Sequence, residues 1–141
     1  MIDYNLDSQG IATLSWNMPG RSQNVLNEES CSALCELVDR AVGDSAVKGV
    51  LMTSAKPDFI AGGDLDWLLS AKTAETLFER VVRLDGALRK LESCGKPVAM
   101  ALPGTTLGGG LEVALCGHYR VAADNPKARF GLPEEIGRAH V

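Results

Sequence analysis

The fold is decided by the stretch from Lys96 to Glu134, which opens with the apolar run Val98-Ala99-Met100-Ala101-Leu102 and continues, after a turn, with Leu107-Gly108-Gly109-Gly110-Leu111-Glu112. An apolar run of this length predicts a buried strand. The residues that follow, Val113-Ala114-Leu115-Cys116, predict the first turns of a packed helix. Three glycines therefore stand at a strand-to-helix junction.

Glycine at such a junction lets the backbone come close to a ligand, and the free N–H groups at the start of a helix attract negative charge. We therefore expect this junction to hold an anionic oxygen. Glu112 would either complement the helix dipole or point into the same site as an acid or base. A tight packing corner is the commoner role of glycines before a helix, and the sequence leaves these alternatives open.

A second junction of the same kind is formed by Phe59-Ile60-Ala61-Gly62-Gly63-Asp64-Leu65. It leads into a predicted short helix from Asp64 to Leu69, which Asp64 could simply cap. N–H groups from the two junctions could stabilise a single developing oxyanion by several kcal/mol in a dry site. Glu112 and Glu134 would then offer an acid and a base.

Predicted strands and helices alternate along the rest of the chain, so we expect an α/β fold. Asn27 is expected to cap a helix that ends at Gly43, and Ala74 to Ser93 is expected to form a second helix. The latter carries an apolar stripe that we interpret as facing the core: Leu77, Val81, Leu84, Leu88 and Leu91. The predicted strands are residues 2–7, 11–16, 50–53 and 119–123, with an extended piece at 129–134.

Composition excludes several classes of function. The 141 residues suit one domain, and a net charge of -4 with scattered Lys and Arg leaves no basic surface for nucleic acid or an anionic membrane. The chain has no apolar run of membrane-spanning length and no signal-peptide features, so we expect a cytoplasmic protein. Its four cysteines are expected to be free thiols. With His118 and His140 as the two histidines, no metal site is expected.

Sequence motifs narrow the chemistry further. The chain contains no G-x-S-x-G nucleophile elbow, no P-loop lysine and no G-x-G-x-x-G spacing. Proton transfer beside a carbonyl group is the chemistry that remains.

Three segments, in order, resemble the signature segments of the crotonase (enoyl-CoA hydratase/isomerase) superfamily: residues 59–65, Gly108-Gly109-Gly110-Leu111-Glu112, and Phe130-Gly131-Leu132-Pro133-Glu134. The opening Asn24-Val25-Leu26-Asn27 and the spacing of the two glutamates are most similar to the hydratase half of the multifunctional fatty-acid oxidation enzymes. The resemblance implies a crotonase-like spiral of ββα units, incomplete at the C-terminus. Residues 1–134 would form the N-terminal part of the hydratase/isomerase domain.

The resemblance also implies roles for individual residues. The N–H groups of Gly63 and Gly109 would form an oxyanion hole for a thioester carbonyl. Glu112 and Glu134 would be the catalytic pair that hydrates trans-2-enoyl-CoA to 3-hydroxyacyl-CoA in fatty-acid β-oxidation. The substrate-binding residues would be Ala61, Gly62, Asp64 and Gly108.

Partners and cofactors follow from the same resemblance. The CoA part of the acyl-CoA substrate would lie along residues 24–26 and 61–64. The hydratase step would need no cofactor, and NAD would be required only by a dehydrogenase half beyond this fragment. The full-length protein would be oligomeric or complexed with a thiolase.

Beyond Glu134 the resemblance stops. Residues 135–141 are expected to be a non-native tail on a truncated fragment, in which His140 has no role. The missing ββα units would leave apolar faces exposed, so the chain is expected to be aggregation-prone and weakly active or inactive. The alternatives are isomerase, dehalogenase or decarboxylase chemistry on another acyl-CoA, and a non-catalytic acyl-CoA-binding subunit.

Overall fold

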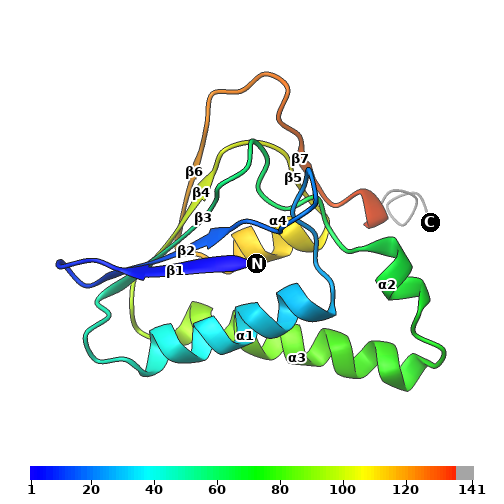
Figure 1. The fold of residues 1–141 in the computed structure, drawn as a ribbon, viewed down its shortest axis with the longest axis horizontal. Helices are drawn as coiled ribbons and strands as arrows, with labels where there is room; N and C mark the ends of the chain where they lie inside the picture. The colour runs from blue at the N-terminus through cyan, green and yellow to red at the C-terminus, as the bar shows by residue number, and fades with distance from the viewer. Residues whose placement is uncertain (136–141) are drawn as a thin grey trace.

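The computed structural model describes residues 1–135, so most of the expected non-native tail lies outside the described residues. Strands and helices alternate as predicted (Figure 1). The strands are β1 (Ile2–Leu6), β2 (Ile11–Trp16), β3 (Gly49–Ser54), β4 (Val98–Leu102), β5 (Thr106–Leu107), β6 (Tyr119–Ala122) and β7 (Phe130–Gly131). The helices are α1 (Glu28–Gly43), α2 (Leu65–Leu69), α3 (Ala74–Ser93), α4 (Gly109–Leu115) and the 3-10 turn η1 (Pro133–Glu135).

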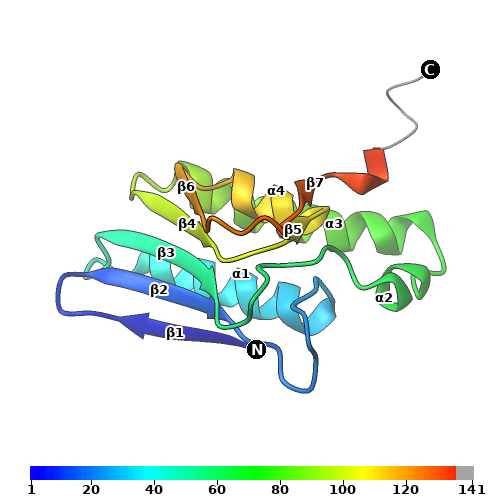
Figure 2. The same ribbon diagram turned by 90° about the horizontal axis from the view of Figure 1, so that it is seen from above.

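The main sheet has the strand order β1-β2-β3-β4-β6. The predicted strands at residues 2–7 and 11–16 are β1 and β2, which form an antiparallel hairpin. In its turn the side chain of Asp7 accepts hydrogen bonds from the N–H groups of Gln9 and Ile11. The other neighbours in this sheet are parallel, as expected when helices connect successive strands. Figure 2 shows the sheet with helices α1, α3 and α4 behind it. The α/β prediction is confirmed.

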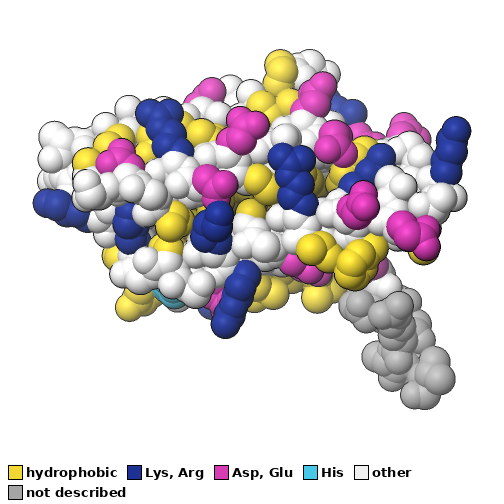
Figure 3. Space-filling model, turned by 90° about the horizontal axis from the view of Figure 1, so that it is seen from below, with side chains coloured by type: hydrophobic (Ala, Val, Ile, Leu, Met, Phe, Trp, Pro, Cys, Tyr) yellow, Lys and Arg dark blue, Asp and Glu magenta, His cyan; other side chains and the backbone are white. Residues whose placement is uncertain are grey.

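Helix α1 begins where the sequence predicts. The side chain of Asn27 accepts from the N–H of Ser30, and the Ser30 hydroxyl accepts from the N–H of Asn27, which closes a capping box. One face of the helix is buried in the core through Leu34 and Val38, and α1 also packs against α3. Charged side chains of both signs lie on the face that the two helices show to solvent (Figure 3).

Helix α3 has the predicted bounds, but the interpretation of its apolar stripe as core is wrong for its first half. Leu88 and Leu91 are buried, whereas Leu77 and Val81 are 38% and 46% exposed. The reason is length, because a helix of 20 residues is about 30 Å long and its N-terminal half extends past the sheet (Figure 1). The N-terminal half of α3 can therefore line a cavity outside the core.

A second layer of short extended segments pairs outside the main sheet. We call it the inner ladder: residues 24–26, 59–64, 105–108 and 129–131. Its backbone hydrogen bonds join neighbouring segments in turn. They are Ala61 N–H to Asn24 O at 2.9 Å, Leu107 N–H to Ile60 O at 3.1 Å, and Gly108 N–H to Gly131 O at 2.9 Å. Each segment follows a main-sheet strand and precedes a helix, so the predicted spiral of ββα units is confirmed. The inner ladder brings the two glycine junctions side by side.

No helix within residues 1–135 is long and apolar enough to cross a membrane.

Candidate functional site

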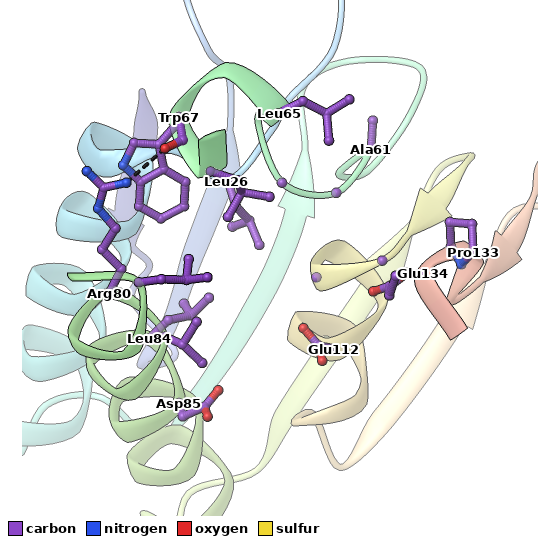
Figure 4. Close-up of a pocket in the computed structure, with 17 residues that line it drawn as sticks. Leu26, Ala61, Leu65, Trp67, Arg80, Leu84, Asp85, Glu112, Pro133 and Glu134 are labelled. Carbon is purple, nitrogen blue, oxygen red and sulfur yellow. Dashed lines mark hydrogen bonds between the residues drawn. The ribbon is translucent and has the colours of Figure 1, made fainter. Parts of the chain in front are cut away.

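A pocket of about 630 Å³ opens where the inner ladder meets α2, α3 and α4 (Figure 4). Seven of the eight residues proposed from sequence for the site line it: Ala61, Gly62, Gly63, Gly108, Gly109, Glu112 and Glu134. Elements far apart in the chain therefore converge on one cavity.

Gly63 lines this pocket through its backbone. Leu26 pairs with Gly63 in a parallel bridge, in which the N–H of Leu26 bonds the carbonyl of Gly62 and its own carbonyl accepts from Asp64. In a parallel bridge the bonds go to the residues that flank the partner, so the N–H of Gly63 faces away from Leu26. None of the described residues accepts a hydrogen bond from it.

The N–H of Gly109 is the second donor at this pocket. Gly108 adopts a φ of +52°, and its own N–H is held by the carbonyl of Gly131. Gly109 is the first residue of α4, a position whose N–H has no partner within the helix. Within residues 1–135 no acceptor bonds this N–H either. Two uncommitted main-chain amides, one from each junction, thus border the same cavity.

The glycines of the two junctions serve different purposes. A Cβ on Gly110 would lie 2.3 Å from the carbonyl oxygen of Ile60, so this glycine is the tight packing corner that the sequence left open. A Cβ on Gly109 would lie 2.6 Å from Cδ1 of Leu26. Gly62 has a φ of +105°, a conformation that suits glycine. In the run from Gly108 to Gly110, Gly110 thus allows close packing against Ile60, while Gly108 and Gly109 line the cavity.

The two glutamates lie beside these amides. Glu112 is on α4 and Glu134 on η1, and Figure 4 shows both carboxylates at the same side of the pocket. The Glu134 oxygens are 3.2 and 3.3 Å from the position of a Cβ on Gly108, and Oε2 of Glu112 is 3.5 Å from that on Gly109. Each carboxylate therefore lies close to one of two adjacent glycines.

Asp64 is placed differently from the other proposed site residues. It is absent from the pocket lining and caps α2, accepting from the N–H groups of Asp66 at 3.1 Å and Trp67 at 3.3 Å. Its carboxylate also pairs with Arg21 at 2.7 Å. The N–H of Trp67 and, after it, the Arg21 guanidinium hold the pKa of Asp64 below its ordinary value. The structure thus shows the capping role that the sequence allowed.

The opposite wall of the pocket is apolar and was missed by sequence reasoning. It is formed by the overhanging half of α3, by α2 and by the inner ladder, and its apolar members are Leu26, Leu65, Leu68, Leu77, Val81 and Leu84. Trp67, Arg80 and Asp85 add polar atoms to this wall (Figure 4). The periodicity of the α3 stripe could have pointed to this wall. Periodicity shows that a helix has an apolar face, but it does not show whether the core or a ligand covers that face.

Asn24, which lies in a segment proposed to follow CoA, is fully buried. Its side-chain amide donates to Ser54 Oγ and Phe59 O, each at 2.9 Å, and its carbonyl accepts from the N–H of Met18 at 3.0 Å. This side chain therefore holds the inner ladder to the main sheet, and any ligand contact from residues 24–26 must come from other atoms.

The cysteines and histidines of the described residues lie outside the pocket. All four cysteines are free, and burial raises the pKa of Cys31 to about 11 and that of Cys116 to about 12. His118 accepts from the N–H of Val98 through Nδ1 at 3.0 Å. Residues 1–135 contain no group of His, Cys, Asp or Glu side chains arranged to hold a metal ion, and His140 lies outside them.

The chain is similar to known proteins over most of its length. A family model described as Enoyl-CoA hydratase/isomerase matches residues 7–137. The fatty acid oxidation complex subunit alpha of Shewanella loihica is 40% identical over 126 residues, which make up 89% of this chain and 18% of that protein. The protein of the same name from Idiomarina loihiensis is 36% identical over 126 residues. The chain thus spans 18% of the length of the curated relatives it matches.

Solved structures show the same fold. An enoyl-CoA hydratase from Bacillus anthracis matches with a TM-score of 0.84 and 26% identity, over 96% of this chain and 51% of that chain. An enoyl-CoA hydratase/isomerase from Xanthobacter autotrophicus Py2 matches with a TM-score of 0.80 and 30% identity, over 94% of this chain and 49% of that chain.

Proposed function

The chain belongs to the enoyl-CoA hydratase/isomerase family, as its three signature segments predict, and we propose that it hydrates trans-2-enoyl-CoA to 3-hydroxyacyl-CoA in fatty-acid β-oxidation. The observation that carries the proposal is the meeting of two uncommitted amides, from Gly63 and Gly109, with two carboxylates at one pocket. The relatives named as alpha subunits of a fatty acid oxidation complex support this metabolic setting.

The two amides would bind the thioester carbonyl oxygen of the substrate. Negative charge develops on this oxygen as the enolate forms, so both N–H groups bind the transition state better than the ground state. Because Gly63 belongs to the inner ladder and Gly109 follows that ladder as the first residue of α4, both donors are oriented before substrate arrives. Preorganised donors of this kind need no rearrangement during the reaction.

Glu112 and Glu134 would hold the attacking water between them. One carboxylate removes a proton from the water as its oxygen bonds to C3 of the enoyl group, and a proton is delivered to C2. The double bond is consumed, and both hydrogens and the oxygen of the water end up in the 3-hydroxyacyl product. The reaction as written needs no redox cofactor.

The pocket also suggests how the substrate would lie. With the carbonyl at the amides and C3 near the carboxylates, the acyl chain would extend along the apolar wall of α2 and α3. The CoA moiety would leave along residues 24–26 and 61–64, with the Asn24 side chain excluded because it is buried. Assembly with further copies or with a thiolase remains part of the proposal for the full-length protein.

Isomerisation of the enoyl double bond is the second candidate. The family model covers both reactions, and one carboxylate suffices to move a proton between two carbons. Glu112 stands on a helix of seven residues, whereas Glu134 stands on the three-residue turn η1. A reaction that depends on Glu112 alone would favour isomerisation.

The test uses crotonyl-CoA and the variants Glu112→Gln and Glu134→Gln. We expect each to lower kcat for loss of the enoyl absorbance by roughly a hundredfold or more, because each removes a proton-transferring group. Glu36→Gln, an exposed glutamate on α1, is the matched control and should keep wild-type turnover. Intact hydration in Glu134→Gln would refute the paired mechanism. Tight acyl-CoA binding without turnover in the wild type would favour the non-catalytic alternative.

A further inference from the structure

Helix α2 forms part of the apolar wall and yet has no buried residue. Leu65 and Leu69 are 72% and 82% exposed, and Trp67 and Leu68 are only half-buried. Within α2, the partly buried Trp67 packs against the core. One such contact does little to hold a five-residue helix in place. Its position therefore depends on polar contacts at its two ends, and Asp64 with Arg21 supplies those at the first end.

Arg80, on α3, supplies the contacts at the other end. Its Nη1 donates to the carbonyl of Trp67 at 2.8 Å (Figure 4). The same nitrogen donates to Ser70 Oγ at 3.3 Å. Its guanidinium carbon lies 5.0 Å from the centroid of the Trp67 ring, within the range of a cation–π contact. One side chain thus binds both the backbone and the indole of α2.

Glu28, on α1, completes the connection. Its Oε2 accepts from the indole N–H of Trp67 at 3.2 Å and lies 3.7 Å from Nε of Arg80. Arg83 adds a second cation, 3.8 Å from Oε1 of Glu28. Arg80 is the most enclosed of the charged groups, with a side chain 21% exposed against 60% for Glu28. Three helices are joined at this cluster, which we call the α2 latch: Glu28, Trp67, Ser70 and Arg80.

The helix that the α2 latch holds lies next to Gly63, whose backbone N–H is one of the two proposed oxyanion donors. Helix α2 follows Gly63 after a single residue, and Cδ1 of Leu68 lies 2.9 Å from the position of a Cβ on Gly63. Arg80 also lies directly before Val81, which lines the pocket together with Leu77 and Leu84. A displacement of α2 would therefore open the apolar wall and shift the segment that carries the first amide.

We propose that Arg80 is a positioning residue that holds α2 closed over the acyl chain, so that its contribution to substrate binding grows with acyl length. The inference rests on the proposed function. The stripe from Leu77 to Leu84 spans about 10 Å of helix, so a four-carbon acyl group contacts only part of it while a ten-carbon group follows its full length. The chemical class of substrate is then a medium-length apolar acyl-CoA.

Kinetics on two substrates test the proposal. With Arg80→Met we expect the ratio of kcat/KM for trans-2-decenoyl-CoA to that for crotonyl-CoA to fall roughly tenfold, mainly through KM, because hydrogen bonds to a charged group are lost. Ser70→Ala should lower the ratio less, since one of two acceptors remains. Arg89→Met, on the same helix with an ion pair to Glu92 as its side-chain partner, should keep the wild-type ratio. An unchanged ratio in both Arg80→Met and Ser70→Ala would overturn the proposal.

Fluorescence tests the α2 latch without any turnover. The chain has two tryptophans, and Trp16 is fully buried, so quenching by acrylamide reports on Trp67. Arg80→Met should increase quenching in the absence of substrate, and Arg89→Met should not. Equal quenching in the wild type and Arg80→Met would refute the latch even if hydration were observed. Increased quenching with no wild-type hydration would retain the latch and refute the proposed function.

Discussion

The carboxylate of Glu134 lies 3.2 Å from the position that a Cβ would occupy on Gly108. The two residues come from separate elements, η1 and the segment before α4, and the N–H of Gly108 is bonded to Gly131 three residues before Glu134. The inner ladder therefore sets where this carboxylate stands. The absence of a side chain at Gly108 leaves the space in which Glu134 lies.

Replacing Gly108 by alanine tests this relationship. The new Cβ would meet the Glu134 oxygens, and a φ of +52° strains any L side chain. We expect kcat for hydration to fall roughly tenfold as the carboxylate is displaced. Unfolding free energy should fall by about 1–2 kcal/mol from the strained backbone. Steady-state kinetics and urea unfolding measure the two effects.

Gly86→Ala is the control for that experiment. Gly86 lies inside α3 with nothing within 4 Å of its Cβ position. Alanine should raise the unfolding free energy by up to about 1 kcal/mol through helix propensity, with turnover preserved. Equal losses of turnover in the two variants would show that the placement of Glu134 is not what Gly108 protects.

Gly110→Ala should be far more destabilising than Gly108→Ala. Its Cβ would lie 2.3 Å from a backbone oxygen of Ile60, which no side-chain rotation can relieve. We expect a loss of about 3 kcal/mol in unfolding free energy, because the inner ladder must separate from α4. Urea unfolding followed by circular dichroism measures it. A variant as stable as Gly86→Ala would contradict the packing role assigned to Gly110.

Asn24→Ala should destabilise the fold by breaking the link between the two layers. The substitution leaves Ser54 Oγ, Phe59 O and the N–H of Met18 without their bonds to Asn24 in a buried setting, at a cost of about 3 kcal/mol. Asn5→Ala, on the exposed side of β1, should change stability by less than about 0.5 kcal/mol. Similar melting temperatures for both variants would disprove this account.

The stability of the fold should depend on pH in the acid range because of Asp64. Its folded-state pKa is lowered, so its contribution is fully present above the unfolded pKa of about 3.9 and is lost as pH falls through the folded value. Asp64→Asn should remove this part of the pH dependence below about pH 4. Asp124→Asn, which removes an exposed carboxylate in a loop, should retain it. Melting temperatures measured from neutral to acid pH would decide, and parallel curves for wild type and Asp64→Asn would count against the cap.

Local features of the fold were predictable from the sequence because they depend on neighbouring residues. The capping box at Asn27 and the bounds of α3 follow from short-range side-chain and backbone preferences. The α2 latch left no such signal, because Glu28, Trp67 and Arg80 are far apart in the chain. The register of the inner ladder was equally non-local. Glu112 and Glu134 were proposed as acid and base from the glycine junctions, whereas their role as a hydratase pair came from family resemblance. The apolar stripe of α3 was predictable, and its second half faces the core as interpreted, whereas its first half lines the pocket instead.

The two proposed donors are peptide groups, and this has a consequence for how such a scaffold diversifies. A substitution at Gly63 or Gly109 leaves the backbone N–H in place unless the new residue is proline, which has no backbone N–H. Glu112 and Glu134, by contrast, can each be replaced by one codon change. Related proteins can therefore keep the two proposed backbone donors while the side chains that transfer protons change. New reactions can then arise from point mutations around an unaltered main chain.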